Sequence, residues 1–193
     1  MLARRTPCVV FLLLLAGCAA SYRLVDAGSH ATDLYTVTSP LEWNEWRGQP
    51  SLWTVDGPVL EFVLHFEGIK DGKKIFKDLD YDIGQPFLAT MRPTQLADLF
   101  VESFVLAHGA KAVKLLGLRP SAFGPWQGFS FDLEFESNMD LQMRAMATGA
   151  VIEERLYLIV YAGARDYYFE KYLPHVEQMV ESITENTNRR RRR

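Results

Sequence analysis

The sequence predicts an α+β domain, in which an antiparallel β-sheet has two amphipathic helices packed on it. Several segments alternate apolar and polar residues with the period of two that a half-buried strand shows, most clearly Phe129–Glu136. Two other segments, which begin near Pro93 and Asp166, repeat apolar residues at helical spacing. The order along the chain is strands, helix, strands, helix, so we expect a sheet whose covered face takes both helices.

The first part of the domain is predicted to consist of strands. Leu34–Thr38 alternate, and Pro40 ends this segment. A short strand is expected over Ser51–Val55, before the turn signal Asp56-Gly57. Val59–Glu67 then alternate, with leucine and phenylalanine on one face and mostly polar side chains on the other, which indicates a half-buried strand.

The first helix is predicted to open at Arg92-Pro93-Thr94, because proline is tolerated in the first helical turn. Its apolar side consists of Leu96, Leu99, Phe100 and Phe104. Gly109 stands where a C-terminal cap glycine is expected.

The second half of the domain is predicted to return to strands before it ends in a helix. A strand over Ala112–Leu118 precedes an expected loop over Pro120–Gly128. The alternating Phe129–Glu136 is followed by Leu141–Thr148, and the nearly continuous apolar run Arg155–Tyr161 is typical of a central strand.

The final helix is expected to be capped by Asp166, and Pro174 is expected to kink it or split it in two. Its apolar stripe consists of Tyr172, Val176, Met179 and Ile183.

Most of residues 34–185 resembles the PsbP-like domains, named after an extrinsic subunit of photosystem II. The resemblance rests on Tyr35, Val37, Pro40 and Trp43, on the aromatic strand from Phe129, and on the end from Tyr157 through Tyr172-Leu173-Pro174 to Ser182-Ile183. It implies a sandwich of sheet and helices that binds other proteins and has no shared catalytic site. The region from Trp43 to Trp46 departs from that pattern, and a cystatin-like or other α+β sheet is the alternative fold.

The N-terminus has the layout of a secretory signal peptide. Arg4 and Arg5 precede the apolar run Cys8–Ala16, which is shorter than the roughly 20 residues that span a bilayer. Leu15-Ala16-Gly17-Cys18 resembles the bacterial lipobox. The resemblance implies that a peptidase reads Leu15, Ala16 and Gly17 and that Cys18 receives a diacylglyceryl group with acyl chains such as palmitate.

The predicted organisation is therefore a lipoprotein signal peptide (1–17), lipidated Cys18 with a flexible tether (18–33), one domain (34–185) and a disordered basic tail (186–193). The residues after Cys18 are Ala19 and Ala20 rather than Asp, so in a Gram-negative cell the outer membrane, facing the periplasm, is the expected location. The chain has two cysteines, and neither Cys8 nor Cys18 would remain as a free thiol in the mature protein.

The charge of the mature chain is asymmetric. Without Arg4 and Arg5, 19 basic and 24 acidic residues remain, a formal net charge of −5. Five of these basic residues form the C-terminal run Arg189, Arg190, Arg191, Arg192 and Arg193, so the remainder carries −10. The run is expected either to bind anionic lipid, through phosphate groups, or to be a solubilising tail without a dedicated partner. Nucleic acid is not expected as a partner outside the cytoplasm.

Large aromatic side chains are candidates for a partner surface. Trp43, Trp46 and Trp126 lie near predicted strand ends, where they could contact a protein, glycan or lipid partner. The alternative is that they close the ends of the sheet as core residues.

The residues that could carry chemistry do not form a recognisable catalytic or metal-binding pattern. Asp78, Asp80 and Asp82 space carboxylates like the start of a calcium loop, but Gly84 comes one residue late and Ala89 replaces the bidentate glutamate. A solvated acidic loop is the favoured interpretation.

Three carboxylates, Asp132, Glu134 and Glu136, share a strand face, as they would in an ordinary half-exposed strand paired with Arg144. The four histidines show no metal-ligand spacing. We therefore expect no enzyme, cofactor or metal site, but a membrane-anchored binding or accessory subunit of the envelope. The alternatives are a small hydrophobic-ligand binder and an envelope hydrolase that uses Glu134.

Overall fold

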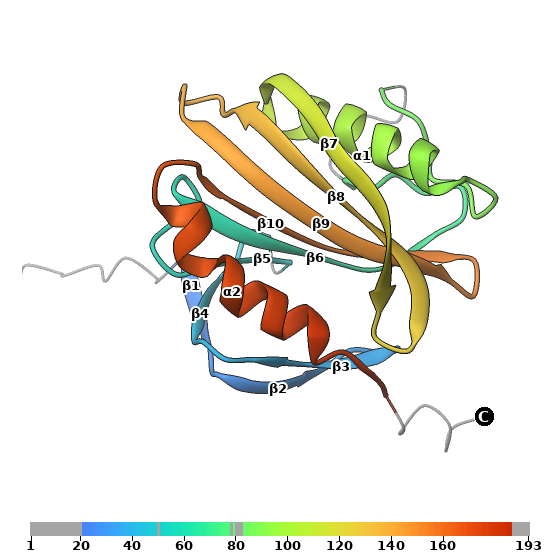
Figure 1. Ribbon diagram of the computed structural model, residues 1–193, viewed down its shortest axis with the longest axis horizontal. Coiled ribbons are helices and arrows are strands. Elements are labelled where there is room, and N and C mark those ends of the chain that lie inside the picture. The colour runs from blue at the N-terminus through green and yellow to red at the C-terminus, as the bar shows by residue number, and fades with distance from the viewer. Residues whose placement is uncertain (1–20, 50, 78, 80–82, 187–193) are drawn as a thin grey trace, which may run out of the picture.

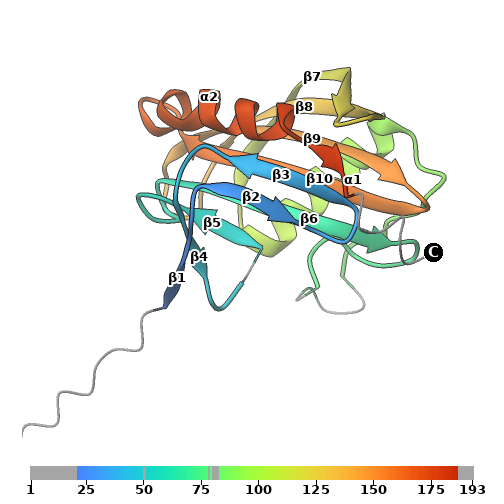
Figure 2. The same cartoon turned by 90° about the horizontal axis from the view of Figure 1, so that it is seen from below.

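The protein folds into three layers, of which the middle one is an eight-stranded antiparallel sheet (Figure 1). The computed structural model describes residues 21–49, 51–77, 79 and 83–186. Helix α1 covers one face of the large sheet, while α2 and a three-stranded sheet cover the other (Figures 1 and 2). The predicted α+β class, an antiparallel sheet with two helices, is confirmed. The signal peptide, Cys18, the three aspartates of the acidic loop and Arg189–Arg193 lie outside the described residues.

All strand neighbours are antiparallel. The large sheet has the order β1 (Tyr22–Val25), β4 (Trp43–Trp46), β5 (Leu52–Thr54), β6 (Glu61–Lys70), β10 (Arg155–Ala164), β9 (Gln142–Ile152), β8 (Trp126–Glu136) and β7 (Lys111–Phe123). The small sheet has the order β11 (Thr184–Glu185), β3 (Tyr35–Ser39) and β2 (Gly28–Ala31). The helices are α1 (Pro93–His108) and α2 (Tyr168–Glu181).

The large sheet is buried on both faces at its centre, which differs from the single covered face that the sequence indicated. In β10, Leu156, Leu158 and Val160 pack under α1, whereas Tyr157 and Ile159 pack under α2 and the small sheet. Successive side chains of a strand point to opposite faces, so the continuous apolar run of β10 supplies both cores.

Strand β6 was predicted to be half-buried, and this is wrong for its first six residues, which are all buried. Its second face carries Glu61, Val63 and His65, and the small sheet and α2 cover the cluster around Val63. The polar residues of this face are therefore interior residues.

The ends of α1 follow the prediction. Pro93 is in the first turn, and the Arg92 backbone N–H donates to Gln95 Oε1 at 2.9 Å. Gly109 is left-handed at φ 64°, and its N–H donates to the Val105 carbonyl at 2.9 Å.

Helix α2 is not split at Pro174, because it is one helix that continues through this residue, and it begins after Tyr167 rather than after the predicted cap Asp166. A proline inside a helix removes one backbone hydrogen bond. The buried face of α2, which includes Tyr172, Val176 and Met179, packs against the large sheet and offsets that loss.

The predicted flexible tether is wrong over residues 22–31, because these residues form β1 and β2. Strand β1 adds to the edge of the large sheet, and β2 pairs with β3. The predicted start of the tail is also wrong for Asn186, whose N–H donates to the Leu34 carbonyl at 2.9 Å. The folded part of the chain thus extends beyond the predicted 34–185 at both ends.

The expected loop over residues 120–128 is mostly strand. Strand β7 continues to Phe123, and β8 begins at Trp126 after a tight turn. Gly124 has φ 57° in this turn, a conformation that glycine adopts without strain.

Candidate functional site

The candidate site is a cleft along β6, where its neighbour β5 ends. Strand β5 pairs with β6 at only two positions, Leu52 with Leu64 and Trp53 with Val63. The last bond on this side joins the His65 N–H to the Ser51 carbonyl at 2.8 Å. In the described part of the chain, residues 66, 67, 69 and 70 of β6 then have a ladder partner only on the β10 side, and Gly68 lies at a β-bulge. Two adjoining cavities lie along this half-paired stretch.

The first cavity has a volume of about 690 Å³ and an apolar wall with acidic side chains at its edge. The wall includes Trp53, His65, Phe66, Ile69, Ile75 and Phe76. Glu45 and Glu67 contribute the carboxyl groups. Burial first, and the charge of Asp33 second, raise the pKa of the Glu67 carboxyl. This volume lies within the range of known small-molecule sites, roughly 300–1,000 Å³.

His65 is the buried titratable group in the wall of this first cavity. Its ring stacks at a tilt against Trp53, with centroids 4.1 Å apart, and Trp53 also meets the His30 ring at 5.3 Å. Burial, with a smaller contribution from the charge of His30, lowers the pKa of His65 to about 3. Its Nε2 atom is buried and has no hydrogen-bond partner. The imidazole is therefore neutral at physiological pH.

The second cavity, of about 550 Å³, continues from the first and is cationic at its rim. Gly68, Ile69 and Lys77 belong to both cavities. The second is lined by four of the seven lysines in the sequence, Lys70, Lys73, Lys74 and Lys77, around an apolar floor of Ile69, Leu79 and Pro86. The cleft as a whole has an apolar interior. The Glu67 carboxyl and the Glu45 carboxylate, which is paired with Arg23, line its first cavity, and lysines surround the second.

The three predicted partner-surface tryptophans do not form one surface. Trp43 is only 1% exposed and its indole Nε1 donates to Ser39 Oγ at 2.8 Å, so its assignment to a surface is wrong and it is a core residue. Trp126 is half-buried against the same core. Trp46 is 39% exposed on β4, which is separated from the β8 strand of Trp126 by four strands of the sheet.

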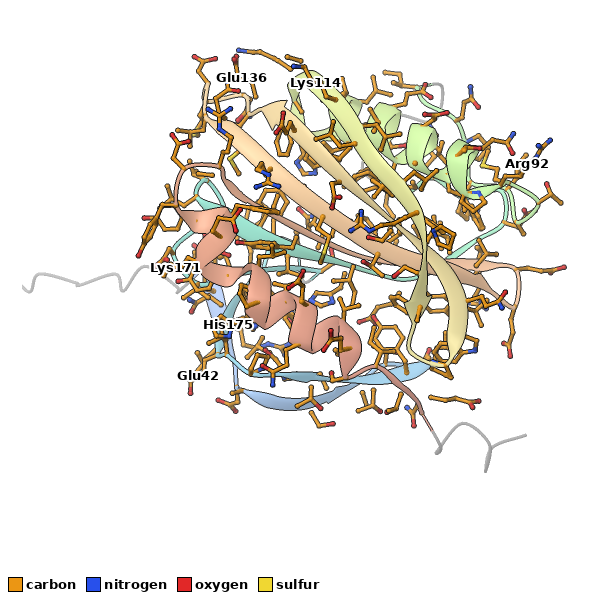
Figure 3. All side chains as sticks on the ribbon, in the orientation of Figure 1. Glu42, Arg92, Lys114, Glu136, Lys171 and His175 are labelled. Carbon is orange, nitrogen blue, oxygen red and sulfur yellow. The ribbon has the colours of Figure 1, made fainter. Side chains whose placement is uncertain are left out.

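Two of the three aligned carboxylates of β8, Asp132 and Glu136, form surface ion pairs. Asp132 accepts from Arg119 Nη1 at 2.6 Å, and Glu136 lies 3.7 Å from Lys111 Nζ. Glu134 stands opposite Arg144 in the ladder, as predicted, but the Arg144 guanidinium pairs with Glu170 of α2 at 2.8 Å. Glu136 and Lys114 lie at the end of the sheet away from β1 and β4 (Figure 3). None of the three carboxylates lines either cavity of the cleft.

The described residues contain no group of three or more His, Cys, Asp or Glu side chains that could hold a metal ion. They also contain no helix that is both long and apolar enough to cross a membrane.

The sequence did not reveal the role of Glu61, a buried carboxylate at the first position of β6. Its Oε1 accepts from Thr54 Oγ1 at 2.7 Å and from the N–H groups of Val55 and Asp56 at 2.6 and 2.8 Å. Its Oε2 has no partner, and burial raises the pKa of the carboxyl. Glu61 thus holds the turn that connects β5 to β6.

No family model and no curated protein matches the chain. Among solved structures, the chain is similar to the solution structure of cyanobacterial PsbP (CyanoP) from Synechocystis sp. PCC 6803, with 12% sequence identity and a TM-score of 0.45. The match covers 89% of this chain and 96% of that one. That protein is a PsbP, and residues 34–185 were predicted to resemble the PsbP-like domains.

Proposed function

We propose that this protein is a lipid-anchored, non-catalytic binding protein of the bacterial cell envelope. The support for the anchor is the short apolar run that ends in Leu15-Ala16-Gly17-Cys18. Two acyl chains on Cys18 would hold the domain on a membrane, at about 0.8 kcal/mol per buried CH₂ group. Ala19 and Ala20 favour the outer membrane, facing the periplasm.

The single observation that carries the binding role is the cleft along β6. The cleft consists of two adjoining cavities, and its floor is apolar. In the part of the chain that the structure describes, the second half of β6 has ladder partners on the β10 side only. Such a cleft suits an elongated ligand with an apolar body and polar groups at its ends.

The cleft is tested by identifying what remains bound to the protein after gentle purification. The full chain is isolated in mild detergent and analysed by native mass spectrometry beside Ile69→Gln, a change in the wall that both cavities share. We expect a small amphiphile on the wild type, and on the order of tenfold weaker retention in the variant, because an apolar contact of this size contributes about 1.5–3 kcal/mol.

The matched control is Leu115→Gln, which makes the same kind of change on an exposed position of β7, away from the cleft. It should retain the ligand as the wild type does. Equal retention by all three proteins would contradict a binding role for the cleft.

A second candidate is an accessory subunit that binds another envelope protein. The observation that favours it is the half-paired stretch of β6, to which an extended segment of a partner could add as a strand. The same purification separates the two candidates. A stoichiometric protein that is lost with Ile69→Gln would support the subunit, and a small molecule alone would support the ligand binder.

The anchor is tested by Cys18→Ser. We expect this variant to fold normally, because position 18 precedes the first strand at Tyr22, and to appear in the soluble periplasmic fraction instead of the membrane fraction. The measurement is fractionation with circular dichroism of the purified variant. A folded variant that still sediments with membranes would overturn the proposed lipid anchor.

The arginine run of residues 189–193 is proposed to bind phosphate groups of anionic lipid, with about 1 kcal/mol from each basic residue near the surface. Chain truncation after Asn188 is the variant that removes this contribution.

A further inference from the structure

The first strand of the domain begins very close to the proposed anchor. Strand β1 starts at Tyr22, four residues after Cys18. Because an extended chain spans at most about 3.6 Å per residue, the Cα atom of Tyr22 lies within roughly 14 Å of the Cα atom of Cys18. This inference rests on the proposed lipid anchor. If Cys18 is acylated, the edge of the sheet at β1 and β4 has to stay next to the bilayer surface.

That edge carries three neighbouring exposed apolar side chains, Tyr22, Leu24 and Trp46, which we name the edge patch. Their exposed fractions are 36%, 56% and 39%. Tyr22 is the direct ladder partner of Trp46, and Leu24 is two residues further along β1, so all three belong to one face of the β1–β4 pair. The opposite face carries Val25 and Trp43, which are buried in the core.

The composition of the edge patch matches the interfacial region of a lipid bilayer. Tyrosine and tryptophan combine an apolar ring with a polar group, and they are enriched at the level of the lipid headgroups. Arg47, next to Trp46, is exposed, and its N–H donates to the Ser21 carbonyl at 2.9 Å, which closes the end of the β1–β4 pair. An arginine at this place can reach lipid phosphates in an otherwise acidic domain.

The Trp46 side chain packs against the backbone of the turn that follows β4. Its indole lies over Gly48, since a Cβ atom at position 48 would be 3.1 Å from the Cε2 and Cζ2 atoms of the ring. A glycine at this turn lets the ring rest on the backbone while its other face stays in solvent.

We propose that the edge patch docks into the headgroup region of the same leaflet that holds the acyl chains of Cys18. The anchor and the patch together then fix the orientation of the domain. Strand β1 lies at one end of the molecule (Figure 2). Glu45 and Gly48, the neighbours of Trp46, line the first cavity, so docking holds this end of the cleft close to the membrane.

The test uses the full-length lipoprotein reconstituted into vesicles of phosphatidylethanolamine and phosphatidylglycerol whose acyl chains are brominated near the headgroup. Bromine quenches tryptophan fluorescence only at short range. We expect clear quenching of the wild type relative to unbrominated vesicles, and at least about a twofold loss of that quenching in Trp46→Phe, because the other tryptophans are buried or half-buried. Leu24→Ser should also reduce quenching while Trp46 remains.

Two controls and a flotation assay make the result decisive. Trp126→Phe, and truncation after Asn188, should leave the quenching unchanged. Protein that floats with the vesicles but shows no quenching, or equal quenching in Trp46→Phe, overturns membrane docking of the patch and leaves the lipid anchor intact. Wild-type protein that does not float overturns the anchor and the docking together. Absence of quenching, together with a dimer that cross-links without vesicles, would overturn membrane docking and assign the edge patch to a second copy of the chain.

Discussion

Gly149→Ala should destabilise the protein by roughly 3 kcal/mol or more, the largest effect that we expect from a single added methyl group. A Cβ atom at position 149 of β9 would clash with the Tyr157 carbonyl oxygen and would stand 2.5 Å from Leu158 Cδ2. Position 149 faces Phe129 of β8 on one side and Leu158 of β10 on the other, so the added atom forces apart strands at the centre of the sheet. Backbone atoms cannot rotate away from such a contact as a flexible side chain can.

The measurement is urea-induced unfolding of Gly149→Ala beside Gly72→Ala. Gly72 has φ 72°, and no other atom lies within 4 Å of the place that an alanine methyl group would take there. Its replacement therefore introduces backbone strain without a clash and should cost only about 1 kcal/mol. A Gly149→Ala protein as stable as Gly72→Ala would show that β9 and β10 are not packed as closely as described.

The parts of the fold that the sequence predicted are those in which local and tertiary preferences agree. The alternation of Phe129, Phe131, Leu133 and Phe135 continues into a real strand with these side chains in one core. The proline and glycine at the two ends of α1 act through local backbone geometry, which does not depend on distant residues. Such signals can be recognised without knowledge of the packing.

The parts that the sequence did not reveal depend on partners far along the chain. Residues 22–31 have no periodic pattern, and they become strands because β4 and β3 offer them ladder partners. Pro174 stays inside α2 because one face of the helix is buried by the sheet. Tertiary contacts outweigh local propensity at both places.

The sequence did not reveal the candidate site for a related reason. Glu61 and His65 occupy the polar positions of an alternating strand, which normally face water. They are buried because the small sheet and α2 cover this face, and no local signal distinguishes them from exposed residues. The cleft itself arises because β5 is three residues long and β6 is ten, a mismatch that only the assembled sheet shows.

His65→Phe should remove a part of the acid sensitivity of the fold. The unfolded chain binds a proton at His65 below about pH 6.5, while burial lowers the folded pKa to about 3. The contribution of neutral His65 to the free energy of unfolding is therefore complete above pH 6.5, and it is lost as the pH falls from 6.5 toward 3. Within this window the free energy of unfolding should decrease by up to about 1.4 kcal/mol for each pH unit through this residue alone.

The measurement is the difference in unfolding free energy between wild type and His65→Phe, from urea titrations between pH 7.5 and 4. Carboxyl groups such as Glu61 and Glu67 titrate in both proteins, so their contributions to the free energy of unfolding cancel in the difference. The stability of the variant relative to the wild type should therefore increase as the pH falls. Near pH 7.5 the two should agree within about 1 kcal/mol, because phenylalanine keeps a ring against Trp53 and removes the unpaired Nε2 atom. His65→Gln, which cannot be protonated either, serves as a second variant. The difference in unfolding free energy between it and the wild type should change with pH by the same amount as for His65→Phe. A difference that does not change with pH would mean that His65 reaches water in the folded protein, and the wall of the first cavity would then be open where the structure has it closed.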